Sequence, residues 1–415
     1  MNGTPTAIIV AGAGVVGLAV AALLATGRSA DRLRVHVLDA RPLPRWRTES
    51  MDPRVYALSR ASQQLFEHLG AWERVMAARA APYRRMRVFQ GADPKAPGAL
   101  DFDSAEIGEP DLGHIVEDSL LRTVLADTIA SAPNATLAIG AEIAAVAVEP
   151  GSVVAELGQG GSVRGSVLLA ADGSDSTVRR LLELPLTEHR YEQTAVVTHV
   201  TSSGAHGDTA WQRFMQGGPL AFLPLTDGRS SVVWSLPTAD AERLLAAGDA
   251  EFLAALNDAS AGVLGTLTAC SARVSFPLKA LHAPRYTTQR AALLGDAAHT
   301  VHPLAGQGMN LGLLDAACVA AVIEDALSAG EDAGDLKVLR RYERERKGDN
   351  LKSLAAFDGL NRLFRLSPRV ASVRALGLAA VDASGPVKRA LMREALGLRA
   401  AHRHRLRWSP APGQA

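Results

Sequence analysis

The start of the chain contains a long apolar segment. Residues 7–25 carry no charged side chain, and a run of this length is typical of a membrane-spanning helix or a signal peptide. Three glycines interrupt the run, however, and no basic residue precedes it. The β-branched residues 8–10 come first, and the helix-forming residues 18–24 follow. This order predicts a buried parallel strand, a tight turn and a buried helix.

The three glycines have the spacing GxGxxG, directly after the predicted strand and directly before the predicted helix. The first permits a tight turn, the second lets backbone N–H groups approach a pyrophosphate, and the third lets the helix pack closely on the strand. The positive end of the helix dipole then faces the phosphates. The segment predicts a dinucleotide site formed by Gly12, Ala13, Gly14, Val15, Val16 and Gly17.

A second predicted strand, residues 34–38, ends at Asp39, which lies 22 residues after Gly17. A carboxylate at this place can accept hydrogen bonds from the adenosine ribose hydroxyls, and it disfavours a 2′-phosphate. An incidental glycine-rich turn is the alternative interpretation. The motif alone does not distinguish FAD from NAD.

A polar turn follows another predicted strand in the middle of the chain. Residues 166–171 lead into Asp172 and Gly173, and a new helix begins after them. Ser174 or Ser176 is a candidate cap for that helix. A dipeptide of this kind is a common turn, so it carries weight only beside other motifs.

Four segments together resemble the flavin-dependent aromatic hydroxylases of the para-hydroxybenzoate hydroxylase type. They are the GxGxxG turn, the Asp172-Gly173 turn, the GDAAH run at 295–299 and the HPLAGQGMNLGLLD run at 302–315. The last run is similar to the signature of the FAD-dependent hydroxylases of ubiquinone biosynthesis. Lesser segments agree at 54–59, 114–117, 218–225 and 231–234, and the resemblance covers roughly residues 5–400.

The resemblance implies an α/β fold with a Rossmann-like FAD-binding domain, an antiparallel β-sheet substrate domain and a C-terminal helical segment. Residues 239–258 have a helical pattern, and the tail from about 334 to 398 is expected to be helical, with breaks near 367, 377 and 385. The expected domains are an FAD-binding domain of residues 1–75, 105–185 and 284–330, a substrate domain of 76–104 and 186–283, and a C-terminal helical region of 331–415.

The resemblance also extends the set of cofactor-binding residues. Asp296 follows a buried strand and is placed to accept a ribityl hydroxyl, as its counterpart does in the family. Free N–H groups at the start of the long apolar helix, which reaches about Leu327, can meet the pyrimidine edge of the flavin. Beyond the first motif and Asp39, the predicted set contains Arg54, Glu117, Asp172, Gly295, Asp296, Pro303, Gly306, Gln307, Gly308, Met309 and Asn310.

The implied chemistry is transfer of oxygen from a flavin C4a-hydroperoxide to an electron-rich ring, with O2 as co-substrate and NAD(P)H or a protein as electron donor. Such chemistry needs an apolar pocket and few catalytic side chains, so no catalytic base is assigned. His299 and His302 are interpreted as structural groups, with proton handling as the alternative. Asp118 stands where the relatives usually have Asn. The aromatic residues Trp211, Phe214, Phe222 and Trp234 line the substrate pocket or belong to the core.

The implied substrate is a polyprenylated phenol or benzoquinol intermediate of ubiquinone biosynthesis, with hydroxylation at C5 or C6 favoured. Three alternatives stay open: a flavin hydroxylase of a soluble aromatic metabolite, a non-catalytic flavoprotein subunit of the quinone-synthesis complex, and a reductase that needs no O2. The ring position, the prenyl chain length and the electron donor are not fixed by the residues.

The charge of the chain is balanced overall, but it is uneven near the C-terminus. The chain has 44 Lys and Arg against 43 Asp and Glu, which gives no nucleic-acid footprint, and its two cysteines suit a reducing compartment without structural zinc. Residues 337–407, however, hold 18 basic residues against 6 acidic ones. This basic tail is either a set of solvated helix faces or a contact with a membrane surface or with accessory or sister proteins of the ubiquinone pathway. The expected location is the cytoplasm; attachment at the inner membrane and homo-oligomerisation are left open.

Overall fold

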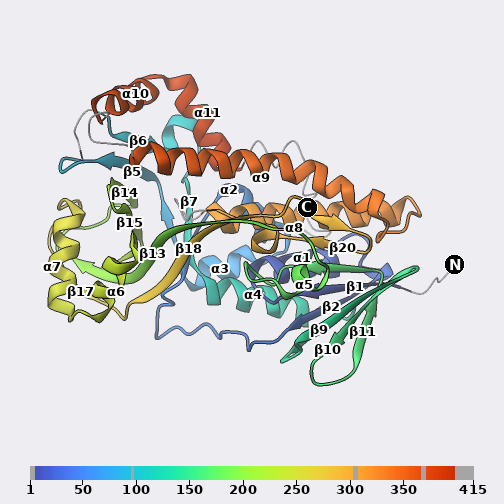
Figure 1. The fold of residues 1–415 in the computed structure, drawn as a ribbon. Coiled ribbons are helices and arrows are strands. Elements are labelled where there is room, and N and C mark those ends of the chain that lie inside the picture. The colour runs from blue at the N-terminus through green and yellow to red at the C-terminus, as the bar shows by residue number, and fades with distance from the viewer. Residues whose placement is uncertain (1–4, 95–97, 302–306, 366–370, 398–415) are drawn as a thin grey trace.

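The computed structural model describes residues 5–94, 98–301, 307–365 and 371–397. A six-stranded sheet lies at the centre of the molecule, and its strands are parallel except for the pairing of β19 with β20 (Figure 1). Its order is β19 (Thr287–Thr288), β20 (Ala291–Leu293), β12 (Val167–Ala170), β1 (Thr6–Ala11), β2 (Leu33–Asp39) and β8 (Ala135–Ile139).

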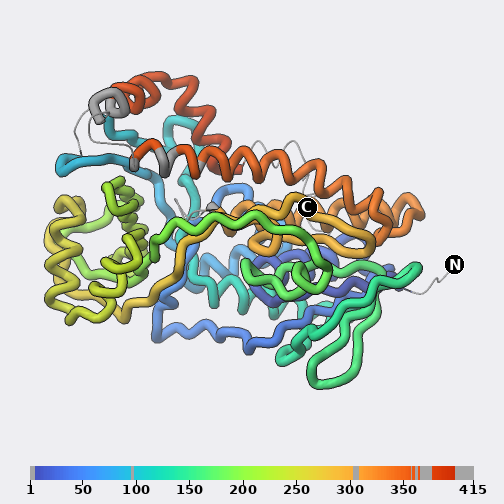
Figure 2. The backbone as a smooth tube through the Cα atoms, in the orientation of Figure 1, coloured from blue at the N-terminus to red at the C-terminus, as the bar shows by residue number. Residues whose placement is uncertain are grey.

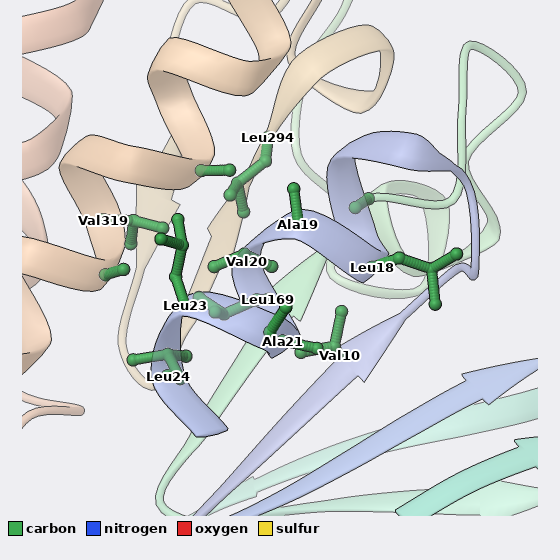
Figure 3. Close-up of a cluster of buried hydrophobic side chains, with 14 of the residues drawn as sticks. Val10, Leu18, Ala19, Val20, Ala21, Leu23, Leu24, Leu169, Leu294 and Val319 are labelled. Atoms are coloured by element: carbon green, nitrogen blue, oxygen red, sulfur yellow. The ribbon is translucent and has the colours of Figure 1, made fainter. Parts of the chain in front are cut away.

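The predicted strand, turn and helix at the start of the chain are confirmed. β1 is followed by α1 (Val15–Thr26), a helix whose apolar residues are buried on nearly every side. Figure 3 shows side chains of α1 gathered with Val10 of β1, Leu169 of β12 and Val319 of α8 (Gln307–Ser328). Because this helix is enclosed by protein, its uncharged sequence forms core and not a membrane span.

Helices cover both the central sheet and one another. α1 lies between α4 (Asp118–Ala130) and α8, and the long helix α9 (Leu336–Arg365) crosses over α8 (Figure 1). The remaining short elements near this sheet are η1 (Ala30–Arg32), α2 (Arg60–His68), α3 (Trp72–Ala78), α5 (Thr177–Leu181) and η3 (Gly295–Ala297).

A second, nine-stranded sheet lies beside the first. Its pairings are antiparallel except that β14 and β5 run parallel. The order is β21 (His299–Thr300), β18 (Val274–His282), β13 (Thr187–Ser202), β16 (Ser230–Pro237), β15 (Gly218–Pro224), β14 (Thr209–Met215), β5 (Arg85–Gln90) and β6 (Leu100–Asp103), with β17 (Leu267–Cys270) paired to β13.

The helical pattern predicted for residues 239–258 forms two helices. α6 (Thr238–Ala246) ends at the extended residue Ala247, and α7 (Asp249–Ser260) begins after Gly248. Two three-stranded sheets complete the β structure. One joins β3 (Val55–Leu58), β7 (Gly113–Glu117) and β4 (Ala80–Tyr83), and the other joins β9 (Ile143–Glu149), β10 (Ser152–Leu157) and β11 (Ser162–Gly165); η2 (Ser104–Ile107) follows β6.

The C-terminal region is helical, as predicted. After α9 come α10 (Ala371–Ala383) and α11 (Gly385–Ala395), which form a helical pair beyond β5 and β6 at one end of the molecule (Figure 2). The expected break near residue 377 is wrong, since Gly377 lies inside α10; one glycine costs a helix only about 1 kcal/mol. The break at 385 is present, and the one near 367 lies outside the described residues. Within the described part of the chain, no helix has the length and apolarity needed to cross a membrane.

Candidate flavin site and substrate cavity

One large cavity, of about 830 Å³, lies between the two main sheets. Its lining includes the residues that follow β1, β2, β12 and β20, at the carboxyl edge of the parallel sheet. Ligands of open parallel sheets bind at this edge. Of the predicted cofactor-binding residues, those that line the cavity are Gly12, Gly14, Val15, Val16, Asp39, Arg54, Asp172, Gly295, Asp296, Gly308 and Met309.

The geometry of the turn after β1 shows why it contains glycines. Gly12 has a φ of +99°, and a Cβ atom there would lie 2.4 Å from the carbonyl oxygen of Ala171. A Cβ atom on Gly17 would lie 2.0 Å from the carbonyl oxygen of Gly12, so a side chain would push α1 away from the turn. Gly14 has no protein atom within 4 Å of its Cβ position. The first and third glycines are therefore needed for packing, whereas the second leaves open space beside the cavity.

Asp39 holds the same turn in place. One carboxylate oxygen accepts a hydrogen bond from the Ala13 N–H at 2.6 Å, and the other accepts one from the Arg41 N–H at 2.8 Å. The carboxylate still lines the cavity. Ala13 and Gly17 do not line it; they shape the turn from behind.

The Asp172-Gly173 turn supplies an unused acceptor. Asp172 Oδ2 accepts a hydrogen bond from the Val178 N–H at 3.0 Å, while Oδ1 is buried and has no hydrogen-bond partner among the described residues. Ser176, one of the two candidate caps, accepts from the Arg179 N–H at 2.9 Å and caps α5. Because buried polar atoms in native proteins are nearly always paired, the free oxygen fits a donor supplied by a ligand.

Asp296 lies on the short turn after β20. Its side chain lines the cavity and is exposed to it, and partial desolvation at the cavity wall raises the pKa of its carboxyl, against the opposing effects of His299, Arg54 and Lys279. Gly295, just before it, has a φ of +54°. Arg179 connects this turn to the previous one by donating to the carbonyl oxygen of Ala297 at 2.8 Å.

A third part of the wall comes from β3 and α4. The guanidinium of Arg54 lies over the ring of Phe276, 4.7 Å from its centre. The Tyr56 hydroxyl donates to Asp118 at 3.1 Å, and Arg122 Nε forms an ion pair with Asp118 at 2.9 Å. Burial and the charge of Asp118 raise the pKa of Tyr56, so the hydroxyl stays protonated. The charge of Asp118 is thus balanced by Arg122.

Glu117 does not reach the cavity. Its buried carboxylate accepts hydrogen bonds from the Trp46 indole at 3.1 Å and from the Asp52 N–H at 2.7 Å, and it forms an ion pair with Arg79 at 2.9 Å. These contacts attach the segment before β3 to the body of the protein. The position predicted as a flavin contact is therefore occupied by a residue that fixes a loop.

Asn310 is also turned away from the cavity. Its Oδ1 accepts from the Ser59 N–H at 2.9 Å and from the Ser62 hydroxyl, and its Nδ2 donates to the carbonyl oxygen of Ala57 at 2.9 Å. It thereby attaches α8 to β3 and α2. Among the other predicted residues of this run, Pro303 and Gly306 lie outside the described residues, and Gln307 begins α8 with its side chain outside the description.

The side of the cavity formed by the nine-stranded sheet contains none of the sequence motifs described above. Alternate residues of β13, β15 and β16 face the cavity, and all are small or aliphatic. They are Ala195, Val197, Ala221, Leu223 and Val233. Sequence reasoning missed them, although the alternation along each strand was a usable signal.

The aromatic residues proposed for the pocket occupy other places. Phe222 and Trp234 point to the opposite face of the sheet, into the core under α6 and α7. Trp211 packs against that same core, and Phe214 stacks on Phe364 of α9 with ring centres 3.8 Å apart. None of the four lines the cavity, so the core interpretation is the one that the structure supports.

His299 has a structural partner. It is buried, and its Nε2 lies 2.5 Å from a carboxylate oxygen of Asp315. It does not line the cavity, and His302 lies outside the described residues. Among the described residues no group of three His, Cys, Asp or Glu side chains could hold a metal ion.

Comparisons with known proteins define the class. Residues 5–350 match the family described as the FAD binding domain. The fold matches the p-nitrophenol 4-monooxygenase PnpA from Pseudomonas putida DLL-E4, with a TM-score of 0.75 at 18% identity over 95% of this chain and 99% of that one. It also matches Klebsiella pneumoniae HpxO complexed with FAD and uric acid, with a TM-score of 0.71 at 20% identity over 94% and 96%.

Relatives of higher identity narrow this class. The 3-demethoxyubiquinol 3-hydroxylase of Escherichia coli K12 is 35% identical over 96% of this chain and 100% of its own length. The ubiquinone hydroxylase UbiL of Rhodospirillum rubrum is 36% identical over 94% and 89%, and the mitochondrial ubiquinone biosynthesis monooxygenase COQ6 of Xenopus tropicalis is 32% identical over 93% and 92%. The chain belongs to the FAD-binding monooxygenases, in the group that contains the ubiquinone hydroxylases. It is an FAD-dependent hydroxylase.

Proposed function

We propose that this hydroxylase acts on the ring of a polyprenylated phenol or benzoquinol intermediate of ubiquinone biosynthesis, with C5 or C6 as the favoured position. The observation that carries the proposal is the composition of the cavity: a polar, glycine-rich wall faces a wall of small aliphatic side chains. A neutral, lipophilic ring fits the second wall, because Ala195, Val197, Ala221, Leu223 and Val233 carry no charge. Lys279, the cation that the same sheet adds to the lining, is already paired with Asp175 at 2.6 Å. The names of the full-length relatives point the same way.

The dinucleotide would lie along the polar wall. The open space at Gly14, the N-terminus of α1 and the unpaired Asp172 oxygen fit the pyrophosphate and hydroxyl groups of FAD. Asp39 would receive the adenosine ribose, and Asp296 a ribityl hydroxyl. We assign the central parallel sheet and its helices to FAD binding and the nine-stranded sheet to substrate binding.

The protein's part in the reaction is position and exclusion of water. Bound FAD supplies the reduction and activation of O2, while the aliphatic wall keeps the reacting ring dry. Tyr56, held as a donor to Asp118, does not act as a base, and no catalytic base is assigned.

Electrons come from NAD(P)H or from a protein donor. A smaller cavity, of about 330 Å³, adjoins the main one and shares Asp39, Arg54 and Arg122 with it. Arg41 also lines it, so the side cavity offers an anionic donor access to the flavin wall. Anaerobic mixing of the oxidised protein with NADH or NADPH measures direct reduction; bleaching of the flavin band only with a protein donor would favour the second source.

A membrane surface is the proposed partner of the C-terminal helical pair. Leu376 of α10 is 72% exposed, and Val387 and Leu391 of α11 are 49% and 50% exposed. The buried side of α11 packs through Met392 and Leu396 against a cluster that includes the cavity residues Ala57 and Leu223. Exposed apolar side chains on a basic segment suit an anionic lipid surface, from which a lipophilic substrate would enter.

Vesicle flotation tests this contact. The triple variant Leu376→Glu, Val387→Glu, Leu391→Glu should lose binding to phosphatidylglycerol vesicles, while a control with Met76→Glu, an exposed apolar residue on α3, should keep it. Equal binding of both variants would remove the membrane from the proposal. Retained binding to accessory proteins alone would favour a protein partner.

The function itself is tested in bacterial hosts that each lack one ring hydroxylase of ubiquinone synthesis. The chain should restore ubiquinone in one host only, and mass spectrometry of the accumulated intermediates then identifies the ring position. Restoration in no host, with FAD bound, would overturn the proposal. Turnover of water-soluble phenols would then favour a soluble aromatic substrate, and absence of any turnover would favour a non-catalytic flavoprotein subunit.

A further inference from the structure

A buried polar cluster lies directly behind the turn that carries Asp296. Its centre is Asp315 of α8, which is fully buried. Around it are His299, which follows the turn, and Arg346 and Asn350, one helical turn apart on α9. The cluster therefore joins three segments that are distant in the sequence, and none of these four residues lines the cavity.

Asp315 accepts four hydrogen bonds, two on each oxygen. Oδ2 accepts from the Gly295 N–H at 3.1 Å and from His299 Nε2 at 2.5 Å. Oδ1 accepts from Arg346 Nε at 2.8 Å and from Asn350 Nδ2 at 3.1 Å. Burial alone would raise the pKa of Asp315, but His299 and Arg346 hold it well below its usual range. The carboxylate is ionised and all its lone pairs are used, so its position is fixed.

His299 contributes one hydrogen bond to the cluster. Its Nε2 donates to Asp315, while Nδ1 is buried with no hydrogen-bond partner among the described residues. The ring does not line the cavity, so its contact with Asp315 acts on the turn from behind.

The two groups held by Oδ2 bracket Asp296. Gly295 precedes it, with its left-handed φ of +54°, and His299 follows three residues later. We propose that His299 and Asp315 are positioning residues, which fix this turn from behind so that the Asp296 carboxylate points into the cavity toward a ribityl hydroxyl of FAD. The inference rests on the Asp296 contact proposed above.

The cluster also gives α9 a part in cofactor binding. Arg346 donates to Asn350 Oδ1 at 2.8 Å as well as to Asp315, so the two α9 residues support each other. None of the α9 residues that the structure describes lines the cavity. Arg346 and Asn350 act on the Asp296 turn through Asp315, whereas Tyr342 contacts the preceding strand β20 separately, so the two contributions can be separated by substitution.

A double-mutant cycle on the full-length chain tests the proposal, with the dissociation constant of FAD as readout. Purified protein is stripped of FAD and titrated with it, for wild type, His299→Phe, Asp296→Ala and the double variant. We expect His299→Phe to raise the dissociation constant about tenfold, because a hydrogen bond to a charged group is lost. In the Asp296→Ala background the same substitution should have almost no further effect.

Two further variants separate positioning from general loss of stability. His299→Gln keeps a donor near the Nε2 position and should restore most of the affinity. Tyr342→Phe removes an equally buried hydrogen bond, which runs from the Tyr342 hydroxyl to the Leu293 carbonyl at 2.8 Å. Leu293 ends β20, the strand before the Asp296 turn, and this variant should leave FAD affinity unchanged. If His299→Phe does not fold, Asn350→Ala, which removes a donor from the α9 side, takes its place in the cycle.

The outcomes are distinct. If His299→Phe weakens FAD binding equally in both backgrounds, the positioning role is overturned while the Asp296 contact stands. If Asp296→Ala leaves FAD affinity unchanged, the proposed contact itself fails, and the positioning role fails with it. A loss of affinity in Tyr342→Phe as large as in His299→Phe would show a general effect of core damage and would also overturn the proposal.

Discussion

The two walls of the cavity are built by opposite means. The dinucleotide wall uses backbone geometry and carboxylates: two glycines that no side chain could replace, and Asp39, Asp172 and Asp296 at the ends of parallel strands. The substrate wall, formed by the nine-stranded sheet, uses the alternation of β13, β15 and β16, with small aliphatic side chains on the cavity face and large ones on the other. β18 adds Phe276, Pro277, Leu278 and Lys279 to this wall. One wall therefore has a few positions that tolerate no change, whereas the other can be altered residue by residue.

This difference separates the residues that fix the fold from those that line the substrate side of the cavity. The residues that would contact FAD are fixed by the packing of β1, β2, β12 and β20 against α1 and α8. The residues that would contact substrate lie on strands whose stability comes from their other face, under α6 and α7. Stability and specificity are thus assigned to opposite faces of the same sheet.

The largest effect is expected when two adjacent residues, one on each face of the sheet, are replaced by alanine. Phe222→Ala should lower the free energy of unfolding by about 3–5 kcal/mol, because Phe222 is 2% exposed in the core. Leu223→Ala, on the cavity face, should cost clearly less and instead change the KM for substrate. Urea unfolding of both variants gives the comparison. Equal losses of stability would mean that the two faces do not differ as described.

A second pair of variants separates packing from binding on the dinucleotide wall. Gly17→Val should destabilise the apoprotein by about 3 kcal/mol, because a Cβ atom there meets the Gly12 carbonyl at 2.0 Å. Gly14→Val should change apoprotein stability by no more than about 1 kcal/mol, since its Cβ position is open and the residue only loses a good N-cap.

The FAD affinity of the same pair completes the test. Gly14→Val should raise the FAD dissociation constant about 100-fold, equivalent to about 2.8 kcal/mol, because the side chain fills the space assigned to the pyrophosphate. Fluorescence titration measures it. Unchanged affinity in Gly14→Val would show that the phosphates lie elsewhere.

Substitution of Glu117 should have an effect of intermediate size on stability. Glu117→Gln should cost about 1–3 kcal/mol of stability, because the carboxylate that holds Trp46, Asp52 and Arg79 loses its charge. FAD affinity should fall less than in Asp172→Ala, which removes a carboxylate from a residue that lines the cavity. A larger loss of FAD in Glu117→Gln than in Asp172→Ala would restore Glu117 as a flavin contact.

The smallest effect concerns the pH dependence of the apoprotein. The folded chain raises the pKa of Asp296 above its unfolded value, so this group favours folding below the unfolded pKa and loses that contribution as pH rises through the folded pKa. Asp296→Asn should therefore be more stable than wild type at pH 7, by less than about 1 kcal/mol because solvent in the cavity screens the charge. The difference should vanish below about pH 4. Thermal unfolding of the FAD-free proteins at both pH values measures it; a less stable variant at pH 7 would contradict the sign.

Local rules explain what could be predicted from the sequence. The glycine turn, Asp39 and the strand ends are short motifs whose geometry is dictated by neighbouring residues, and the structure places them around one cavity. The Asp315–Arg346 pair could not be predicted in this way, since it depends on how α9 crosses α8. Glu117 was predicted as a contact because its position in the motif does not reveal which way the side chain turns.

The order of strands in the central sheet has a consequence for synthesis of the chain. β1 pairs with β12 through Ala11 and Ala170, and β12 pairs in turn with β20 through Ala170 and Leu293. At about 5–20 residues per second, β1 leaves the ribosome on the order of ten seconds before its partner β12 exists, and β20 follows later still. Until then one edge of the apolar strand β1 is unpaired, a state prone to aggregation. Early contact of β1 with α1 and β2 shields it, which gives the glycine turn a task during biogenesis before any cofactor arrives.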